Sequence, residues 1–471
     1  MKSILKSLID YSLFEKYDKE YFINNKILPI FENDISIKIA ICKSSNLQTI
    51  KDDFSKLISF IELEELELLF ILSHINRKIL LYSLASKAIF QNSFEKYIDK
   101  FLQELISFSI DLRTSDIHIE QYKELVLFKF RIDGRLKTFF AFKNEFFKLI
   151  SSYIKLISAL DMTQIRLPLD GRFSLSIENK KYDFRVSTMP TLEAESIVLR
   201  ILDNKNIDKN LQTLGLSTNL LEILTQTLKL TQGLILISGP TGSGKTTTLY
   251  SILQELNCEE KKIITVEDPI EYKIDSICQI PINSKIGLSF ELVLKNILRQ
   301  DPDIIMVGEI RDHDTANMAI QAALTGHLVL STLHTNDAPS SLTRLHDLGV
   351  QPFLTAATIL GVLAQRLVRR LCPHCKQQTA INEQEWEHLT FDYMMDMPTT
   401  MYKAVGCEVC RQTGYKGRVG IYEFMPVSLE LKSIISANGT LDHLRAQAKK
   451  EGIEPLRIAG ARKVIEGMTT L

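Results

Sequence analysis

The stretch GLILISGPTGSGKTTTLYSILQEL occupies residues 233–256 and decides which fold this chain can adopt. Its first six residues form a short, almost continuously apolar run, which predicts a strand buried on both faces of a sheet. Residues 239–246, GPTGSGKT, match the P-loop pattern, in which a glycine-rich turn ends in lysine and threonine. Residues 247–256 are typical of the helix that follows such a turn. The order strand, P-loop and helix predicts an α/β core that binds a nucleotide.

The predicted phosphate cradle comprises Gly239, Pro240, Thr241, Gly242, Ser243, Gly244, Lys245, Thr246 and Thr247. Its glycines let backbone N–H groups turn inward around phosphate oxygens. Lys245 is expected to reach the β- and γ-phosphates, and the Thr246 hydroxyl is expected to bind Mg²⁺. A chance glycine-rich turn is the alternative, and the flanking strand and helix disfavour it. ATP and Mg²⁺ are therefore the predicted ligands.

Three further apolar runs, residues 262–266, 304–307 and 328–332, predict a parallel sheet covered by helices. Acidic and imidazole side chains flank these runs. Glu267 follows the first, Glu309 follows the second, and His327 and His334 stand on either side of the third. We expect all four at the edge of the sheet that carries the P-loop, although any one alone could be a capping residue. Glu309 is the residue we expect to orient or deprotonate the attacking water.

Two Cys-x-x-Cys pairs predict a structural zinc site. The pairs are Cys372 with Cys375 and Cys407 with Cys410. Four thiolates suit tetrahedral Zn²⁺ and leave no open position for catalysis. Disulfides and unmetallated thiols are the alternatives, and His374 is expected to be exposed and not a ligand. The other three of the seven cysteines, Cys42, Cys258 and Cys278, are expected to be small buried apolar residues.

Composition bounds the class of protein and the number of domains. The 471 residues are 45% hydrophobic and 24% charged, which is typical of a soluble globular chain with two or three domains. We predict domains at residues 1–90, 91–205 and 206–471, with a zinc insertion at about 370–412. In the second domain, residues 94–107 have the period of a helix, and alternating runs at 116–120, 125–132, 173–177 and 181–186 predict strands. Asp133-Gly134 and Asp170-Gly171 predict turns.

Charge argues against a protein that binds nucleic acid, and hydropathy argues against one that spans a membrane. The formal net charge is −1, and no apolar run reaches the length that spans a bilayer. The basic run at residues 366–370 is short, and we interpret it as a helix end or subunit contact. The start of the chain lacks the pattern of a secretory signal. These features predict a soluble protein that meets a membrane only through partners.

At these motifs the sequence resembles the secretion ATPases that drive type II secretion and type IV pilus assembly. The resemblance runs from Phe94 to Leu471 and rests on the P-loop, the acidic box 267–271, the segment 308–312 and the histidine box 325–334. It implies an α/β fold: a RecA-like P-loop NTPase core with a zinc-binding insertion, preceded by a small α+β domain and a short α/β N-terminal docking domain. It also implies that Glu309 is the catalytic carboxylate and that both boxes line the nucleotide.

The resemblance further implies residues and partners that the composition does not reveal. The family's arginine pair maps onto Arg185 and Arg200, which would face the γ-phosphate; from the residues alone they are surface ion-pair partners. Family members form six-membered rings. They are cytoplasmic, lie at the inner membrane through a platform protein, and bind a cytoplasmic docking partner. The zinc element marks assembly-type motors. The chain departs from the family pattern at Ala194 and at Leu169, in the domain that must swing.

Two other functions stay open at this point. A helicase-like or DNA-translocating hexameric ATPase has a similar core, and a scaffold could bind nucleotide without hydrolysing it. The intact Lys245, Thr246 and Glu309 argue against the scaffold. Type II secretion, pilus extension and assembly of a DNA-uptake pseudopilus are not separated by these motifs.

Overall fold

The computed structural model describes residues 9–46, 54, 56–91, 94–202, 210–283, 286–393 and 395–471. The chain divides into two compact units. Unit 1 contains residues up to 204 together with 372–375 and 404–416, and unit 2 contains residues 205–371, 376–403 and 417–471. The predicted boundary near residue 205 falls at 203–209, outside the described residues. The division into three domains stays a prediction.

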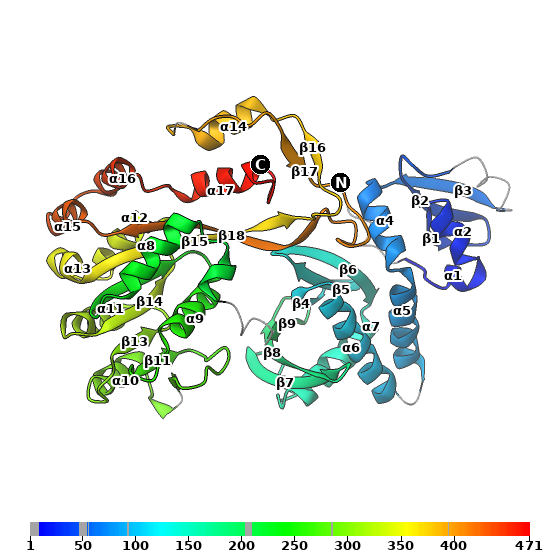
Figure 1. Ribbon diagram of the computed structural model, residues 1–471. Helices are drawn as coiled ribbons and strands as arrows, with labels where there is room; N and C mark the ends of the chain where they lie inside the picture. The colour runs from blue at the N-terminus through cyan, green and yellow to red at the C-terminus, as the bar shows by residue number, and fades with distance from the viewer. Residues whose placement is uncertain are drawn as a thin grey trace. The chain divides into compact units, whose positions relative to one another are not determined.

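Unit 1 begins with a small α/β module (Figure 1). Its sheet has the order β1-β2-β3, with β2 antiparallel to β1 and parallel to β3, among the residues described. Phe22, Ile37 and Leu68 are fully buried in its core. The elements are α1 (Leu13–Lys16), α2 (Lys19–Asn24), β1 (Leu28–Glu32), β2 (Ser36–Ile41), β3 (Leu57–Glu62), α4 (Glu65–Ser73) and α5 (Ile75–Phe90).

The rest of unit 1 is an antiparallel sheet covered by two amphipathic helices. Helix α5 also packs into this core, through Leu81 and Leu84. The described strands follow the order β6-β5-β4-β9-β8-β7, and phenylalanines dominate the core. The elements are α6 (Phe94–Asp111), β4 (Thr114–Gln121), β5 (Leu125–Ile132), β6 (Arg135–Lys143), α7 (Glu145–Ile157), β7 (Leu169–Ile177), β8 (Lys180–Pro190) and β9 (Glu195–Leu202).

Of the two predicted turns in this sheet, one is confirmed and one is wrong. Asp133 and Gly134 join β5 to β6 with positive φ angles of 46° and 86°. Asp170 and Gly171 instead lie inside β7, paired with Ser187 and Val186 of β8. Glycine is required at 171 because a Cβ atom there would come within 2.9 Å of the Ser158 carbonyl oxygen. Close packing against the neighbouring loop, and not a change of direction, explains this glycine.

Unit 2 is built on a sheet of order β12-β11-β13-β14-β10-β15-β18, in which all neighbouring strands from β12 to β15 are parallel. Alternate residues of β10 enter different cores: Leu234 and Leu236 face one side, and Ile235 and Ile237 face the other. Helices therefore cover both faces, as the apolar runs predict. The strands are β10 (Gly233–Ser238), β11 (Ile263–Glu267), β12 (Cys278–Pro281), β13 (Ile304–Val307), β14 (Leu328–Leu333), β15 (Ile359–Leu371) and β18 (Tyr415–Pro426).

The helices of unit 2 are mostly capped by side chains at their first turn. Asp312 and Asp337 each accept a backbone N–H at 2.8 Å and so begin α11 and α12. The helical elements are η3 (Leu211–Leu214), α8 (Thr218–Leu228), α9 (Lys245–Leu256), α10 (Phe290–Ile297), α11 (His313–Leu324), α12 (Ala338–Asp347), α13 (Pro352–Thr358), α15 (Leu429–Ser436), α16 (Leu441–Lys450) and α17 (Leu456–Ile465).

One expectation about unit 2 needs correction. The basic run at 366–370 lies inside strand β15 and is not a helix end. Residues 376–403 do not cluster with the cysteine knuckles; they form β16 (Gln377–Thr379), α14 (Glu383–Thr390) and β17 (Met401–Lys403). Trp386 of α14 is buried against Ala461 and Val464 of α17, which explains why this segment joins unit 2.

In the described part of the chain, no single helix is long and apolar enough to cross a membrane. One pair of helical segments, Glu67–Ser73 and Ile75–Phe90, meets the length and composition criteria together, but the pair bends by 68° at its break.

Candidate active site

The P-loop lies between the end of β10 and the start of α9. Gly239 has a φ of 146°, and a Cβ atom at this position would come within 2.5 Å of the Gln365 carbonyl oxygen, so only glycine fits. The Lys245 Nζ donates to the carbonyl oxygens of Gly239 at 2.6 Å and Pro240 at 3.2 Å. Burial lowers the pKa of Lys245 to about 8, against the opposing effect of the Glu309 carboxylate. The lysine side chain thus reaches back to the first two residues of the loop. Thr246 is exposed on the first turn of α9.

Glu309 and His334 meet where two adjacent strands end. Glu309 follows β13 and His334 follows β14; the His334 Nε2 lies 3.5 Å from a Glu309 carboxylate oxygen. The other oxygen of Glu309 pairs with Arg311. Burial lowers the pKa of His334, and the charge of Lys245 adds to this effect. The structure therefore brings Lys245, Glu309 and His334 to one edge of the sheet, as their positions after the strands predict.

Glu267 reaches the same edge but faces inward. It ends β11, is 4% exposed, and accepts hydrogen bonds from Tyr250, Thr265 and Gln279. Tyr250 lies on α9, the helix that follows the P-loop. The carboxylate therefore ties that helix to β11, and its oxygen atoms are engaged within the protein.

His327 lies at the opposite edge, so the expectation that it joins the P-loop is wrong. Leu328, the next residue, pairs with Gly233 at the start of β10, whereas the P-loop follows Ser238 at the end of that strand. The separation along the strands is about 17 Å. Parallel strands share an edge at their carboxyl ends, and His327 precedes its strand. Its Nδ1 lies 2.9 Å from the carbonyl oxygen of Ala322 at the end of α11.

Gln365 is a residue of this site that sequence reasoning missed. It lies in the middle of β15, is 1% exposed, and donates from Nε2 to the Ser243 carbonyl oxygen at 2.8 Å. Its carbonyl oxygen also limits the space at Gly239. Gln365 therefore lies against the P-loop at two positions, Gly239 and Ser243. No motif marks it, because the contact depends on β15 lying beside β10.

Arg185 and Arg200 lie in a row of charged residues across the sheet of unit 1. In the strand register, Arg185 of β8 lies opposite Arg200 of β9 and Arg172 of β7. Arg200 lies opposite Asp116 of β4, and Asp116 lies opposite Arg131 of β5. Directly paired residues project from the same face of an antiparallel sheet. The Arg200 Nε donates to Asp116 at 2.8 Å. This row thus contains four guanidinium groups and one carboxylate, and only the register reveals Arg172 and Arg131 as part of it.

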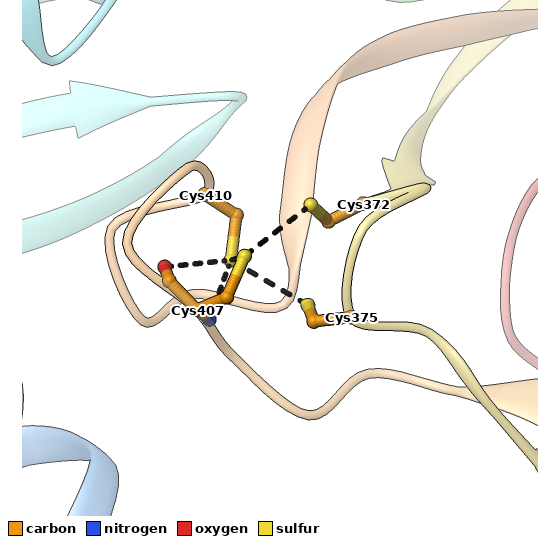
Figure 2. Close-up of side chains that lie close together, drawn as sticks. All are labelled: Cys372, Cys375, Cys407 and Cys410. Atoms are coloured by element: carbon orange, nitrogen blue, oxygen red, sulfur yellow. Dashed lines mark hydrogen bonds between the residues drawn. The ribbon is translucent and has the colours of Figure 1, made fainter.

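The four paired cysteines converge on one point (Figure 2). Their sulfur atoms all lie within 4.8 Å of one another, and three pairs are 3.7–3.8 Å apart. Tetrahedral zinc with Zn–S bonds of about 2.3 Å requires sulfurs about 3.8 Å apart. A disulfide requires about 2.05 Å. The sulfur positions therefore fit a zinc ion and not disulfides, and His374 is exposed and outside the cluster, as expected.

Backbone donors favour the thiolate form of Cys410, whereas burial raises the pKa of the Cys372 and Cys375 thiols. The N–H groups of Cys407 and Gly414 point at the Cys410 sulfur at 3.1 and 3.2 Å and, although burial opposes them, help lower its pKa to about 7. Of the remaining cysteines, Cys42 is buried as expected. Cys258 and Cys278 are exposed, because one lies in the loop after α9 and the other begins the edge strand β12.

We predict one zinc ion per chain. Freshly purified protein is expected to contain stoichiometric zinc by mass spectrometry of metals, and Cys372→Ser is expected to lose it, because three thiolates bind the ion less tightly. Cys278→Ser is the matched control, since it removes an exposed thiol outside the cluster and should keep the metal. A metal-free wild-type chain whose four thiols all react with a thiol reagent would contradict the site.

Comparisons with known proteins agree with these motifs. Residues 91–471 match the family described as Type II/IV secretion system protein. The type IV pilus assembly ATPase TfpB of Acinetobacter baylyi is 52% identical over 80% of this chain and 65% of its own length. Type II secretion system protein E of Pseudomonas aeruginosa is 44% identical over 79% of this chain and 74% of its own length. The chain thus spans about two thirds to three quarters of these relatives.

A solved structure is similar in fold. The Legionella pneumophila ATPase DotB superposes with a TM-score of 0.59 at 23% identity, covering 79% of this chain and 93% of DotB. At this identity the likeness concerns the fold alone.

Proposed function

The chain belongs to the secretion ATPases of the Type II/IV secretion system protein family, and we propose that it is the motor subunit that powers type II secretion or the assembly of type IV pili or pseudopili. The observation that carries this proposal is the meeting of Lys245, Glu309 and His334 at the edge of the sheet where the P-loop opens. This combination suits ATP hydrolysis, because the cation can bind the phosphates and the carboxylate can take the proton of the attacking water.

We propose the following roles for the groups at this edge. Lys245 exchanges its bonds with two carbonyl oxygens for bonds with the β- and γ-phosphates. Glu309 orients the attacking water and accepts its proton, and His334 holds the carboxylate in place. Mg²⁺, bound through Thr246, would neutralise phosphate charge. The guanidinium groups of Arg185 and Arg200 would contact the γ-phosphate, because a planar fork donates two hydrogen bonds at once.

Further parts of the proposal follow from the family resemblance. The chain would form a hexamer and act in the cytoplasm at the inner membrane, where a platform protein receives the motion. Residues 1–90 would bind the cytoplasmic docking partner. The cysteine cluster supports an assembly-type motor.

Phosphate release by the purified full chain tests the proposal against its alternative. We expect Mg²⁺-dependent ATP hydrolysis that depends on protein concentration, as a ring enzyme requires, and that is unchanged by single- or double-stranded DNA at physiological salt. Strong stimulation by DNA under these conditions would favour the DNA-translocating motor instead. Binding of ATP by a hexamer without phosphate release would favour a scaffold.

A further inference from the structure

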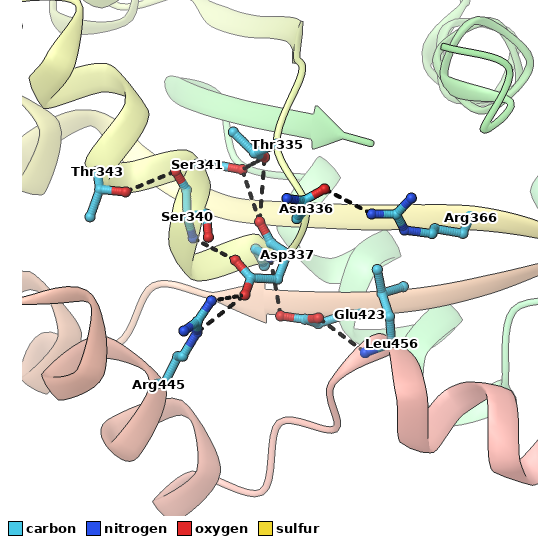
Figure 3. A network of polar contacts seen from close by, with 11 residues as sticks. Thr335, Asn336, Asp337, Ser340, Ser341, Thr343, Arg366, Glu423, Arg445 and Leu456 are labelled. Atoms are coloured by element: carbon cyan, nitrogen blue, oxygen red, sulfur yellow. Dashed lines mark hydrogen bonds and ion pairs between the residues drawn. The ribbon is translucent and has the colours of Figure 1, made fainter. Parts of the chain in front are cut away.

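A buried carboxylate that the proposed mechanism does not use, that of Glu423, lies beside the segment Thr335 to Asp337 (Figure 3). Glu423 is on β18 and is 3% exposed. One of its oxygens accepts the backbone N–H of Ala338, the first residue of α12, and the other accepts that of Leu456, the first residue of α17; both distances are 3.1 Å. A single carboxylate therefore joins the starts of two helices, where positive helix dipoles favour it.

The neighbouring polar contacts extend this connection to a third helix. Asp337 caps α12 and also accepts two hydrogen bonds from Arg445 of α16, at 2.6 and 3.2 Å. Asn336, beside it, accepts a hydrogen bond from Arg366 of β15 at 2.9 Å. The turn at residues 335–337 is thus held from three sides within unit 2, and it begins directly after His334.

Burying the carboxyl group of Glu423 costs free energy of folding, and packing alone does not explain why an acid is present here. Burial raises the pKa of Glu423 to about 7, helped by the charge of Asp337 and opposed by both backbone donors and Arg445. Tyr393 also lies within electrostatic range. A folded-state pKa above the ordinary value means that ionisation weakens the fold as the pH rises toward 7. An apolar residue at position 423 would avoid this penalty. What the acid adds is its two hydrogen bonds to the backbone at the starts of α12 and α17.

We propose that Glu423 is a positioning residue that fixes the turn after His334 and links it to α17, while Asp337 links the same turn to α16. Movement at the nucleotide would reach those helices through His334, the turn and this carboxylate. The inference rests on the proposed function, because it assigns His334 to the ATPase site. The contacts of Glu423 and Asp337 can be tested separately from ATP hydrolysis.

Glu423→Gln tests the link by separating turnover from binding. An amide keeps the size but places an N–H₂ group against one of the two backbone donors, so one hydrogen bond is lost. We expect kcat per nucleotide-binding site to fall about tenfold, as for a loss of about 1.4 kcal/mol, with the KM for ATP changed less than about twofold. The kcat of the wild type should also change with pH near 7, and that inflection should be absent in the variant. Glu430→Gln, an exposed acid on α15, should behave as wild type.

Two further measurements keep the inference falsifiable if Glu423→Gln folds poorly. Arg445→Gln removes a half-exposed partner of Asp337 and should fold; we expect a two- to threefold loss of kcat at unchanged KM. Hydrogen–deuterium exchange should show faster exchange at the starts of both α12 and α17 in Glu423→Gln, and this readout does not depend on hydrolysis. The inference would be overturned if these variants had the same kcat, pH profile and hydrogen–deuterium exchange as the wild type. An inactive wild type with the expected exchange would instead overturn the proposed function.

Discussion

Replacing Glu309 with glutamine is expected to lower ATP turnover by at least about a hundredfold while nucleotide binding persists. The amide keeps the shape of the side chain but cannot accept the proton of the attacking water, a role worth a factor of about 10² to 10⁴. Binding should persist because the P-loop and Lys245 are unchanged. Single-turnover phosphate release and equilibrium binding of a fluorescent ATP analogue measure the two effects separately.

Asp314→Asn is the matched control for this substitution. Asp314 is an exposed acid in the first turn of α11, five residues beyond Glu309, and its neutralisation should leave turnover unchanged. If Glu309→Gln kept wild-type turnover, the carboxylate would not be the base. The proton would then have to leave through another group, and His334, whose Nε2 lies 3.5 Å from Glu309, would be the candidate.

The features of the site that the sequence predicts are those in which local spacing determines position. Lys245 must follow a glycine-rich turn that starts where β10 ends, so the motif and the apolar run together place it. Glu309 and His334 come directly after apolar strands, and parallel strands end at a common edge. The same rule, applied without regard to strand direction, led to the error for His327, which stands before its strand.

The features that the sequence does not predict depend on which strands become neighbours. Gln365 meets the P-loop because β15 lies beside β10, and Arg172 joins the arginine row because β7 pairs with β8 in one particular register. Glu423 gains its partners only when α12 and α17 both start beside β18. The hydrogen-bonded partners of Gln365 and Glu423 lie 33 to 122 residues away in the sequence, and no periodicity carries that information.

Replacing Lys245 with alanine is expected to remove most nucleotide affinity as well as turnover. The ammonium group is the only cation of the loop itself, and a charge-assisted hydrogen bond to phosphate is among the stronger interactions available to it. We expect ATP binding to weaken by about a hundredfold or more. Calorimetric titration of the full chain with ATP and Mg²⁺ measures it, with Lys261→Ala as the control, because Lys261 is exposed before β11 at the opposite edge of the sheet.

The pH dependence of binding gives a second test of the same charge. Since burial lowers the pKa of Lys245 to about 8, its charged fraction falls as the pH rises above that value. Wild-type affinity for ATP should therefore weaken above pH 8, and the weak affinity of Lys245→Ala should not change over the same range. If the variant bound ATP as tightly as the wild type, backbone N–H groups alone would hold the phosphates. Lys245 would then keep its bonds to the Gly239 and Pro240 carbonyl oxygens in the complex, and its role would be to shape the loop.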